Sequence, residues 1–294
     1  MRIAGHTLGT PDQTVPEALR LFRGAGLDAA EVILQDGYRS GIAPGDPRAV
    51  ADAAAAATGE GVDIVALTPY TMDINDPGET VRSRAVDELK HAVDVAGELG
   101  AGRIRVYAGR WQPGRPDEAA HWAALTRSLQ ELGAYADGTG VHLCVENHFG
   151  TMTQSAVATA KLVREVGSPH VRVLYDQANL TFTHDEGYEP ALAVQGDLIS
   201  HVHVKDLVFT DANQPFHAAG TARVEAEERA VRSRVVGDGI LPWQAILGCL
   251  QELGYDGILS LEYEYRWHPQ DLPDPAEGFR RGAEAVRAIL GRLA

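Results

Sequence analysis

Four ionisable residues stand at the ends of four successive apolar segments in the second half of the chain. They are Glu146 after Leu143-Cys144-Val145, Asp176 after Val173-Leu174-Tyr175, His203 in His201-Val202-His203-Val204, and Glu262 after Ile258-Leu259-Ser260-Leu261. An unpaired charge in a partly dry environment is costly, and a divalent cation removes that cost. Three carboxylates with one imidazole suit Mn²⁺, Mg²⁺ or Co²⁺, and Zn²⁺ is also possible. The residue types therefore predict a metal centre; for each residue alone, a helix cap, a solvated loop position or a hydrogen-bonded core histidine is the alternative.

These residues need a scaffold that brings the four segment ends together. Apolar segments of strand length alternate with amphipathic stretches of helix length. The expected strands are Arg2–Leu8, Ala29–Leu34, Val62–Leu67, Arg103–Tyr107, Val141–Glu146, Val171–Tyr175, Ile199–Val204 and Gly257–Glu262. Such alternation implies parallel strands joined by right-handed crossovers. The count of eight, and the lack of a Gly-rich phosphate turn after the first strand, favour a closed (β/α)8 TIM barrel over an open doubly wound sheet.

The helices expected between these strands have recognisable starts and apolar stripes. Asp46-Pro47 provides an N-cap followed by proline at the first helical position. The later helices are predicted at Pro77–Leu99, Asp117–Asp137, Gln154–Val166, Pro242–Leu253 and Pro275–Leu293. In a (β/α)8 barrel the C-terminal ends of the strands converge on one face, where catalytic groups are found. The four strand-end residues are therefore expected to meet at this mouth.

Composition limits the class of protein. The 294 residues fit one barrel domain, 1–294, and 45% of them are hydrophobic. With 26 basic and 41 acidic residues the net charge is −15, which opposes binding to nucleic acid and to anionic membrane surfaces. The two cysteines suggest no disulfide framework. We expect no leader and no membrane span, a cytoplasmic location and a small-molecule partner, with a homo-oligomer possible.

One connection is much longer than the others. It runs from Leu207 to Leu241 and includes the charged stretch Glu225–Arg234. Loops of this length are usually functional or disordered. We predict that 207–241 is a lid at the barrel mouth, with a short helix in the charged stretch; a disordered surface excursion is the alternative.

Several motifs occur in an order that is similar to a known superfamily. They are Val145-Glu146-Asn147-His148, Asp176-Gln177-Ala178-Asn179, His201-Val202-His203-Val204-Lys205-Asp206, Gly237-Asp238-Gly239 with Trp243, and Gly254-Tyr255-Asp256-Gly257 before Leu261-Glu262. Over nearly the whole chain they resemble the xylose isomerase-like TIM barrel superfamily. Its members include sugar phosphate isomerases and epimerases, ketose 3-epimerases, hydroxypyruvate isomerase, inosose dehydratase and endonuclease IV. The motifs together are fairly specific for the superfamily and poorly specific for a substrate.

The resemblance implies a ligand set for one divalent metal, with Mn²⁺ the first expectation: Glu146, Asp176, His203 and Glu262. It also selects His203 as the ligand over His201, since strand periodicity places both on one face. Ketose 3-epimerases typically carry a substrate-binding histidine at the position of Asn179 and an arginine at the position of Phe209. These two differences argue against a strict ketose 3-epimerase.

Four further residues are candidates for substrate binding. His148 lies two residues beyond Glu146 and should face the same cavity nearer the mouth. Lys205 stands in the same relation to His203 and is expected to hold a substrate oxygen or phosphate; for both, a supporting or salt-bridged role is the alternative. Asn179 lies just past Asp176. Trp111, after the fourth strand, either stacks on a sugar ring or packs within its loop.

The resemblance implies proton transfer at a carbon next to a sugar carbonyl. The metal would act as a Lewis acid that stabilises the enediolate, and Glu146 and Glu262 would be the acid/base pair. Return of the proton to the neighbouring carbon gives isomerisation, return to the opposite face gives epimerisation, and loss of a β-hydroxyl gives dehydration, as in inosose dehydratase. The ligand set is compatible with all three reactions.

Two other classes of protein remain as alternatives. A phosphodiester-cleaving enzyme like endonuclease IV would need further metal ligands on the second to fourth strands, where Glu31 is present but no histidine ends the second or third strand. A non-catalytic sugar-binding or accessory barrel is the other. Turnover with a panel of ketoses would separate the accessory protein from an isomerase.

Overall fold

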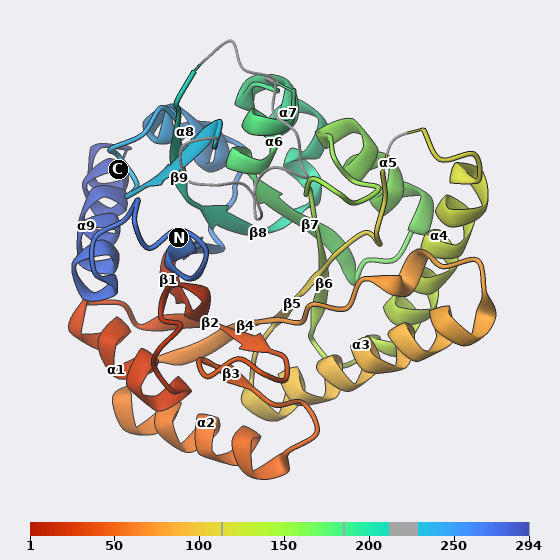
Figure 1. The fold of residues 1–294 in the computed structure, drawn as a ribbon, viewed down its shortest axis with the longest axis horizontal. Helices are drawn as coiled ribbons and strands as arrows, with labels where there is room; N and C mark the ends of the chain where they lie inside the picture. Colours follow the sequence, from red (N-terminus) through yellow and green to blue (C-terminus); the bar gives the residue numbers. More distant parts are fainter. Residues whose placement is uncertain (113, 185, 212–228, 294) are drawn as a thin grey trace.

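A closed ring of parallel strands forms the centre of the computed structural model (Figure 1), which describes residues 1–112, 114–184, 186–211 and 229–293. The ring strands are β1 (Arg2–His6), β2 (Ala29–Leu34), β4 (Asp63–Thr68), β5 (Arg103–Val106), β6 (His142–Glu146), β7 (Val171–Asp176), β8 (Ile199–Val204) and β11 (Ile258–Leu261). They follow one another around the ring in chain order, and the pairing of β1 with both β11 and β2 closes it. The predicted (β/α)8 TIM barrel is confirmed.

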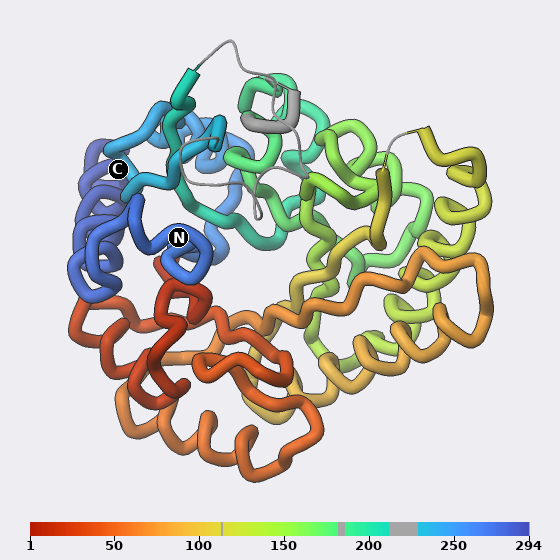
Figure 2. The backbone as a smooth tube through the Cα atoms, viewed as in Figure 1, coloured from red at the N-terminus to blue at the C-terminus, as the bar shows by residue number. Residues whose placement is uncertain are grey.

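Helices surround the strands on the outside (Figure 1). They are α1 (Val15–Gly24), α2 (Pro47–Glu60), α3 (Glu79–Leu99), α4 (Glu118–Tyr135), α5 (Ala156–Val166), α6 (Gln177–His184), α7 (Tyr188–Gln195), α8 (Trp243–Glu252) and α9 (Pro275–Leu293). The tube in Figure 2 shows the last helix, α9, beside the first, α1, so that both ends of the chain complete the same ring.

Local sequence explains where these helices begin. The Asp46 side chain accepts a hydrogen bond of 2.9 Å from the Arg48 backbone N–H and caps α2, with Pro47 at its first turn, as predicted. At α1, Glu17 reaches back to the backbone N–H of Thr14 at 2.7 Å in a capping box.

The barrel interior is layered because side chains alternate between the two faces of each strand. Ala4 of β1 pairs in register with Ala29 of β2, and both belong to a small apolar cluster with Val65 and Ile258. Two residues further along the same strands, His6 lies opposite Glu31. The interior therefore changes from apolar to ionisable toward the C-terminal ends of the strands.

The long connection after β8 is more ordered than predicted over its described part. Asp206–Phe209 forms β9 and Val231–Arg234 forms β10, and the two pair antiparallel. The helix predicted over Glu225–Arg234 is wrong for 231–234, where the main chain pairs with β9; residues 212–228, which include the rest of that prediction and much of the predicted lid, lie outside the described residues.

Further short elements go beyond those that the sequence analysis names. α6 and α7 follow β7, and β3 (Gly41–Ile42) adds to β2. Among the helices of the described ranges, none is long and apolar enough to cross a membrane.

Candidate functional site

Strand register brings the four predicted ligands together. Asp176 at the end of β7 is the register partner of His203 in β8, and His203 is also paired with Ser260 of β11. Glu262 directly follows β11, and its backbone N–H bonds to Val204 O at 3.1 Å. With Glu146 at the end of β6, one ligand atom from each of the four residues lies within 4.8 Å of the others.

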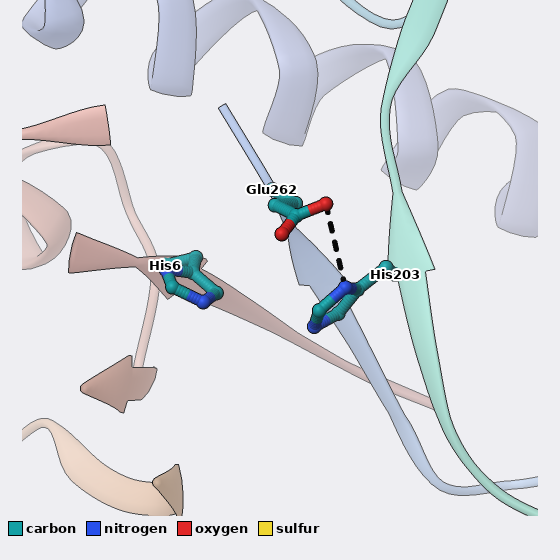
Figure 3. Close-up of side chains that lie close together, drawn as sticks. All are labelled: His6, His203 and Glu262. Atoms are coloured by element: carbon teal, nitrogen blue, oxygen red, sulfur yellow. Dashed lines mark ion pairs between the residues drawn. The ribbon is translucent and has the colours of Figure 1, made fainter. Parts of the chain in front are cut away.

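The imidazole of His203 is at the centre of this group. Its Nδ1 lies 3.4 Å from Glu262 Oε2, 3.5 Å from Glu146 Oε1 and 3.8 Å from Asp176 Oδ2. Figure 3 shows the contact between His203 and Glu262, with His6 of β1 nearby. All four residues are buried, and Glu262, at 6%, is the most exposed of them.

Positive and polar groups hold these carboxylates. Lys205 Nζ lies 2.6 Å from Glu262 Oε2, 2.9 Å from Asp176 Oδ2 and 3.4 Å from Glu264 Oε1. Asn179 donates its side-chain amide to Glu146 Oε1 at 3.0 Å, and its backbone N–H to Asp176 Oδ1 at 2.9 Å. The predicted substrate-binding residues Asn179 and Lys205 thus contact the predicted ligands directly.

Arg105 of β5 is a second positively charged group beside these carboxylates. Its guanidinium lies 3.5 Å from Glu146 Oε2, donates to Tyr107 Oη at 2.8 Å and to Pro69 O at 3.0 Å, and stacks over the rings of Tyr107 and Tyr70 at 4.0 and 4.4 Å. The sequence analysis missed this residue. An arginine at an interior position of the strand Arg103–Val106 was the available signal.

Burial and the close approach of these charged groups shift their pKa values in different directions. Burial, reinforced by the nearby Glu262 and Glu146, raises the pKa of Asp176 to about 7, although Lys205 opposes the shift. Burial also acts on Glu146, but His148, His203 and Arg105 outweigh it and lower its pKa to about 2. For Glu262 the positive charges of Lys205 and His203 overcome burial and hold its pKa well below the usual range.

The donor set fits a divalent cation. Ligand atoms that share an ion at about 2.1 Å lie roughly 3.0–3.5 Å apart, and the spacing around His203 Nδ1 is close to this. Within the described part of the chain, His203 Nδ1 is buried without a hydrogen bond. A buried nitrogen that faces three carboxylates, with no hydrogen bond of its own, is what a metal-ligating imidazole presents.

The other two candidate residues also contact neighbours outside this group. His148 Nδ1 is 2.5 Å from Phe149 O, and its ring packs edge-on against Tyr107 at 4.8 Å between centroids. Trp111 is 6% exposed and packs in the apolar core near His121 and Arg115, which corresponds to the loop-packing alternative.

The motif Gly237-Asp238-Gly239, together with Trp243, fixes the position of Lys205. The carboxylate of the next residue, Asp206, accepts backbone N–H groups from Gly237, Gly239 and Leu241 at 3.0 to 3.2 Å. A Cβ on Gly239 would collide with that carboxylate. Trp243 donates its indole N–H to Lys205 O at 3.2 Å, so the strand-end lysine is held from two sides.

A buried carboxylate lies beneath His203, and the sequence analysis named it only in weighing the endonuclease IV alternative, without a role at this site. Glu31 of β2 lies 3.1 Å from His203 Nε2 and 2.8 Å from His201 Nε2, and His6 Nε2 lies 3.6 Å from the same carboxylate. An acid within Ala29–Leu34, a strand whose residues are all buried, was the signal that could have identified it.

Several solved structures share this fold. A D-psicose 3-epimerase in the presence of D-fructose is 18% identical with a TM-score of 0.76, and the alignment covers 99% of this chain and 100% of that one. The IOLI protein with a zinc atom is 16% identical with a TM-score of 0.79, covering 100% and 99%. A 3-keto-D-glucoside 4-epimerase from E. coli is 19% identical with a TM-score of 0.75, and the alignment covers 98% of this chain and 99% of that one. At these identities the likeness establishes the fold.

Sequence relatives are inosose dehydratases. The protein from Geobacillus thermodenitrificans is 29% identical over 172 residues, which are 58% of this chain and 55% of that protein. The protein from Lacticaseibacillus casei is 27% identical over 143 residues, 49% of this chain and 47% of that one. The chain thus spans about half the length of the curated relatives that it matches.

A family model covers far more of the chain than these pairwise matches. The model described as xylose isomerase-like TIM barrel matches residues 19–289, a range that contains Glu31, all four predicted ligands and Lys205. The chain belongs to the xylose isomerase-like TIM barrel family.

Proposed function

We propose that this chain is a divalent-metal-dependent enzyme that transfers a proton at the carbon next to a carbonyl of a sugar or keto-sugar, as an isomerase or epimerase. The observation that carries the proposal is the group of four formed by Glu146, Asp176, His203 and Glu262, in which one ligand atom of each residue lies within 4.8 Å of the others. A divalent cation held there would stabilise the negative charge that develops on the carbonyl oxygen as the proton leaves.

The residues around this group have distinct proposed roles. Glu146 and Glu262 stand at the ends of β6 and beside β11 and are the proposed acid/base pair, since both have a carboxylate in the group. Neighbouring positive charges lower the pKa of both carboxylates. Lys205, 2.6 Å from Glu262, is proposed to bind a substrate oxygen, and Asn179 to orient Glu146. His148 and Trp111 are also proposed to contact the substrate.

A dehydratase is the second candidate function. It is favoured by the sequence relatives, which are inosose dehydratases at 26–29% identity. Removal of the same proton, followed by loss of a hydroxyl from the next carbon, converts isomerase chemistry into elimination of water. The two functions therefore share the site and differ in which bond breaks second.

The native metal ion, the location and the partners of this protein are proposals as well. Mn²⁺ is the proposed native ion because the donor set has three oxygens and one nitrogen, and Zn²⁺, Mg²⁺ and Co²⁺ are compatible with it. We also propose a cytoplasmic protein whose partner is a small carbohydrate, without nucleic acid or membrane, and a homo-oligomer is compatible with this assignment.

We expect the Mn²⁺-loaded protein to exchange a substrate proton with solvent. The experiment incubates it in D₂O with ketohexoses, ketose phosphates and a keto-inositol and follows each by NMR and mass spectrometry. Deuterium on the carbon next to the carbonyl, with an isomeric product, identifies an isomerase or epimerase; a product that has lost water identifies the dehydratase. Neither product nor exchange with any member of the panel, in protein that contains stoichiometric metal, would instead indicate a non-catalytic accessory barrel.

A further inference from the structure

A second buried carboxylate lies on the far side of the His203 ring. Glu31 is fully buried, and its Oε2 and Oε1 lie 3.1 and 3.2 Å from His203 Nε2. Its Oε2 also lies 2.8 Å from His201 Nε2. An ionised carboxylate in an apolar strand is costly unless hydrogen bonds satisfy it. The donors that surround Glu31 should therefore explain its presence there.

The hydrogen bonds assign the proton positions around Glu31. His6 Nδ1 accepts the backbone N–H of Leu8 at 3.0 Å, so the ring proton of a neutral His6 is on Nε2. That nitrogen lies 3.1 Å from Thr68 Oγ1, which accepts from it. The Thr68 hydroxyl is then free to donate, and it does so to Glu31 Oε1 at 2.6 Å. Glu31 Oε1 thus accepts a hydrogen bond from Thr68, and the backbone N–H of Leu8 fixes the direction of this chain of bonds through His6.

The other donors to Glu31 are the two histidines of β8. A carboxylate only accepts hydrogen bonds, so His203 must present its N–H at Nε2. A metal-ligating imidazole is neutral and has one N–H. With that N–H on Nε2, the lone pair of the metal-bound ring is on Nδ1, the nitrogen that faces the carboxylates of Glu146, Asp176 and Glu262 at 3.4 to 3.8 Å. The same bonds fix the ring orientation, because Nε2 contacts both oxygens of Glu31.

We infer that Glu31 is a positioning residue that holds His203 in the form with its proton on Nε2 and so makes Nδ1 the metal-ligating atom. The inference rests on the proposed metal-dependent function. A carboxylate behind a ligating histidine fixes its tautomer and raises its basicity, and loss of such a partner typically weakens metal binding by roughly 10- to 100-fold.

Glu31 is less suited to be a metal ligand itself. Its two oxygens already accept hydrogen bonds from Thr68 at 2.6 Å and His201 at 2.8 Å. The ring of His203 also lies between Glu31 and the other carboxylates, since Nε2 contacts Glu31 and Nδ1 contacts Glu262. Glu31 therefore lies outside the ligand group, as a hydrogen-bond partner of the ligand His203.

Replacement of Glu31 by glutamine tests this role. Glu31→Gln keeps the size of the side chain, but its amide has one acceptor oxygen for the three donors His201, His203 and Thr68. We expect affinity for Mn²⁺ and Zn²⁺, measured by titration calorimetry, to fall by roughly 10- to 100-fold. In the Zn²⁺-loaded protein, imidazole ¹H–¹⁵N spectra should show the His203 proton on Nε2 and its loss or weakening in Glu31→Gln. Glu31→Asp keeps the charge on a shorter side chain, so its affinity should be intermediate.

A matched control removes a buried charge elsewhere. Asp271 is 1% exposed at its side chain and is held by Arg229 and Arg232, so Asp271→Asn should bind metal with the parent affinity. Unchanged affinity and an unchanged Nε2 proton in folded Glu31→Gln would overturn the inference and leave the proposed metal centre intact. An equal loss in Asp271→Asn would also overturn it, as a general effect of charge removal. A parent protein that binds neither ion would overturn the proposed function and this inference together.

Discussion

Glu262→Gln is expected to lower turnover by roughly 10²-fold or more, the usual scale for loss of a general base. Glutamine keeps the size of the side chain and one oxygen near His203 Nδ1, which lies 3.4 Å from the native carboxylate. It cannot accept the substrate proton. Metal occupancy should therefore fall only modestly, and steady-state kinetics in excess Mn²⁺ should still show the loss in kcat.

The neighbouring acid provides a matched control for this change. Glu264 also pairs with Lys205, at 3.4 Å, but lies outside the group of four ligands. Glu264→Gln should keep most of the activity. Recovery of Glu262→Gln to wild-type turnover in excess metal would contradict a chemical role, as would undiminished incorporation of solvent deuterium by the variant.

Asp176→Ala is expected to weaken metal binding by at least about 10²-fold, more than the loss of an outer hydrogen-bond partner typically costs. Asp176 supplies an oxygen that faces His203 Nδ1 at 3.8 Å, and it is the register partner of that histidine. The barrel should survive, because its core is formed by strands and helices below the mouth. Elemental analysis and calorimetric titration of the folded variant measure the effect.

A second substitution separates two consequences of removing Asp176. Its Oδ1 also accepts the backbone N–H of Asn179 at the start of α6, and loss of such a cap costs about 0.5–2 kcal/mol. Asp176→Asn retains an oxygen for the cap but removes the charge. Both variants should lose metal affinity, and Asp176→Ala should also unfold at a lower temperature. Stoichiometric metal at wild-type affinity in either folded variant would show that Asp176 is not a ligand.

Much of the barrel could be predicted because most of its strands are short, predominantly apolar segments between helical stretches. Ala29–Leu34 and Ile199–Val204 have the bounds that the sequence predicts, and every residue in both is buried. The sequence analysis did not name α6, although Asp176 is a typical N-cap residue and its Oδ1 accepts the backbone N–H of Asn179 at the start of that helix. The β9–β10 pairing joins segments more than 20 residues apart, where a local helical pattern was misleading.

The ligand group was predictable because each member ends an apolar segment, a feature that is visible one strand at a time. The buried acid Glu31 could be noticed in the sequence, but its contacts with His201 and His203, 170 and 172 residues away in the chain, could not be predicted. Lys205 was predicted to contact substrate, but its position between Asp176 and Glu262 follows from the register of β7, β8 and β11. Pairwise contacts across the barrel are set by closure, which sequence spacing alone does not specify.

The most direct test of the account is the relation between bound metal and activity. Protein stripped by exhaustive chelation, with its metal content verified by elemental analysis, is assayed before and after addition of Mn²⁺, Co²⁺, Mg²⁺ or Zn²⁺ with whichever substrate the deuterium-exchange panel identifies. The account predicts that the stripped protein is inactive and that activity returns in proportion to one divalent ion per chain, with Mn²⁺ or Co²⁺ effective. Full turnover by protein verified to be free of metal would contradict it.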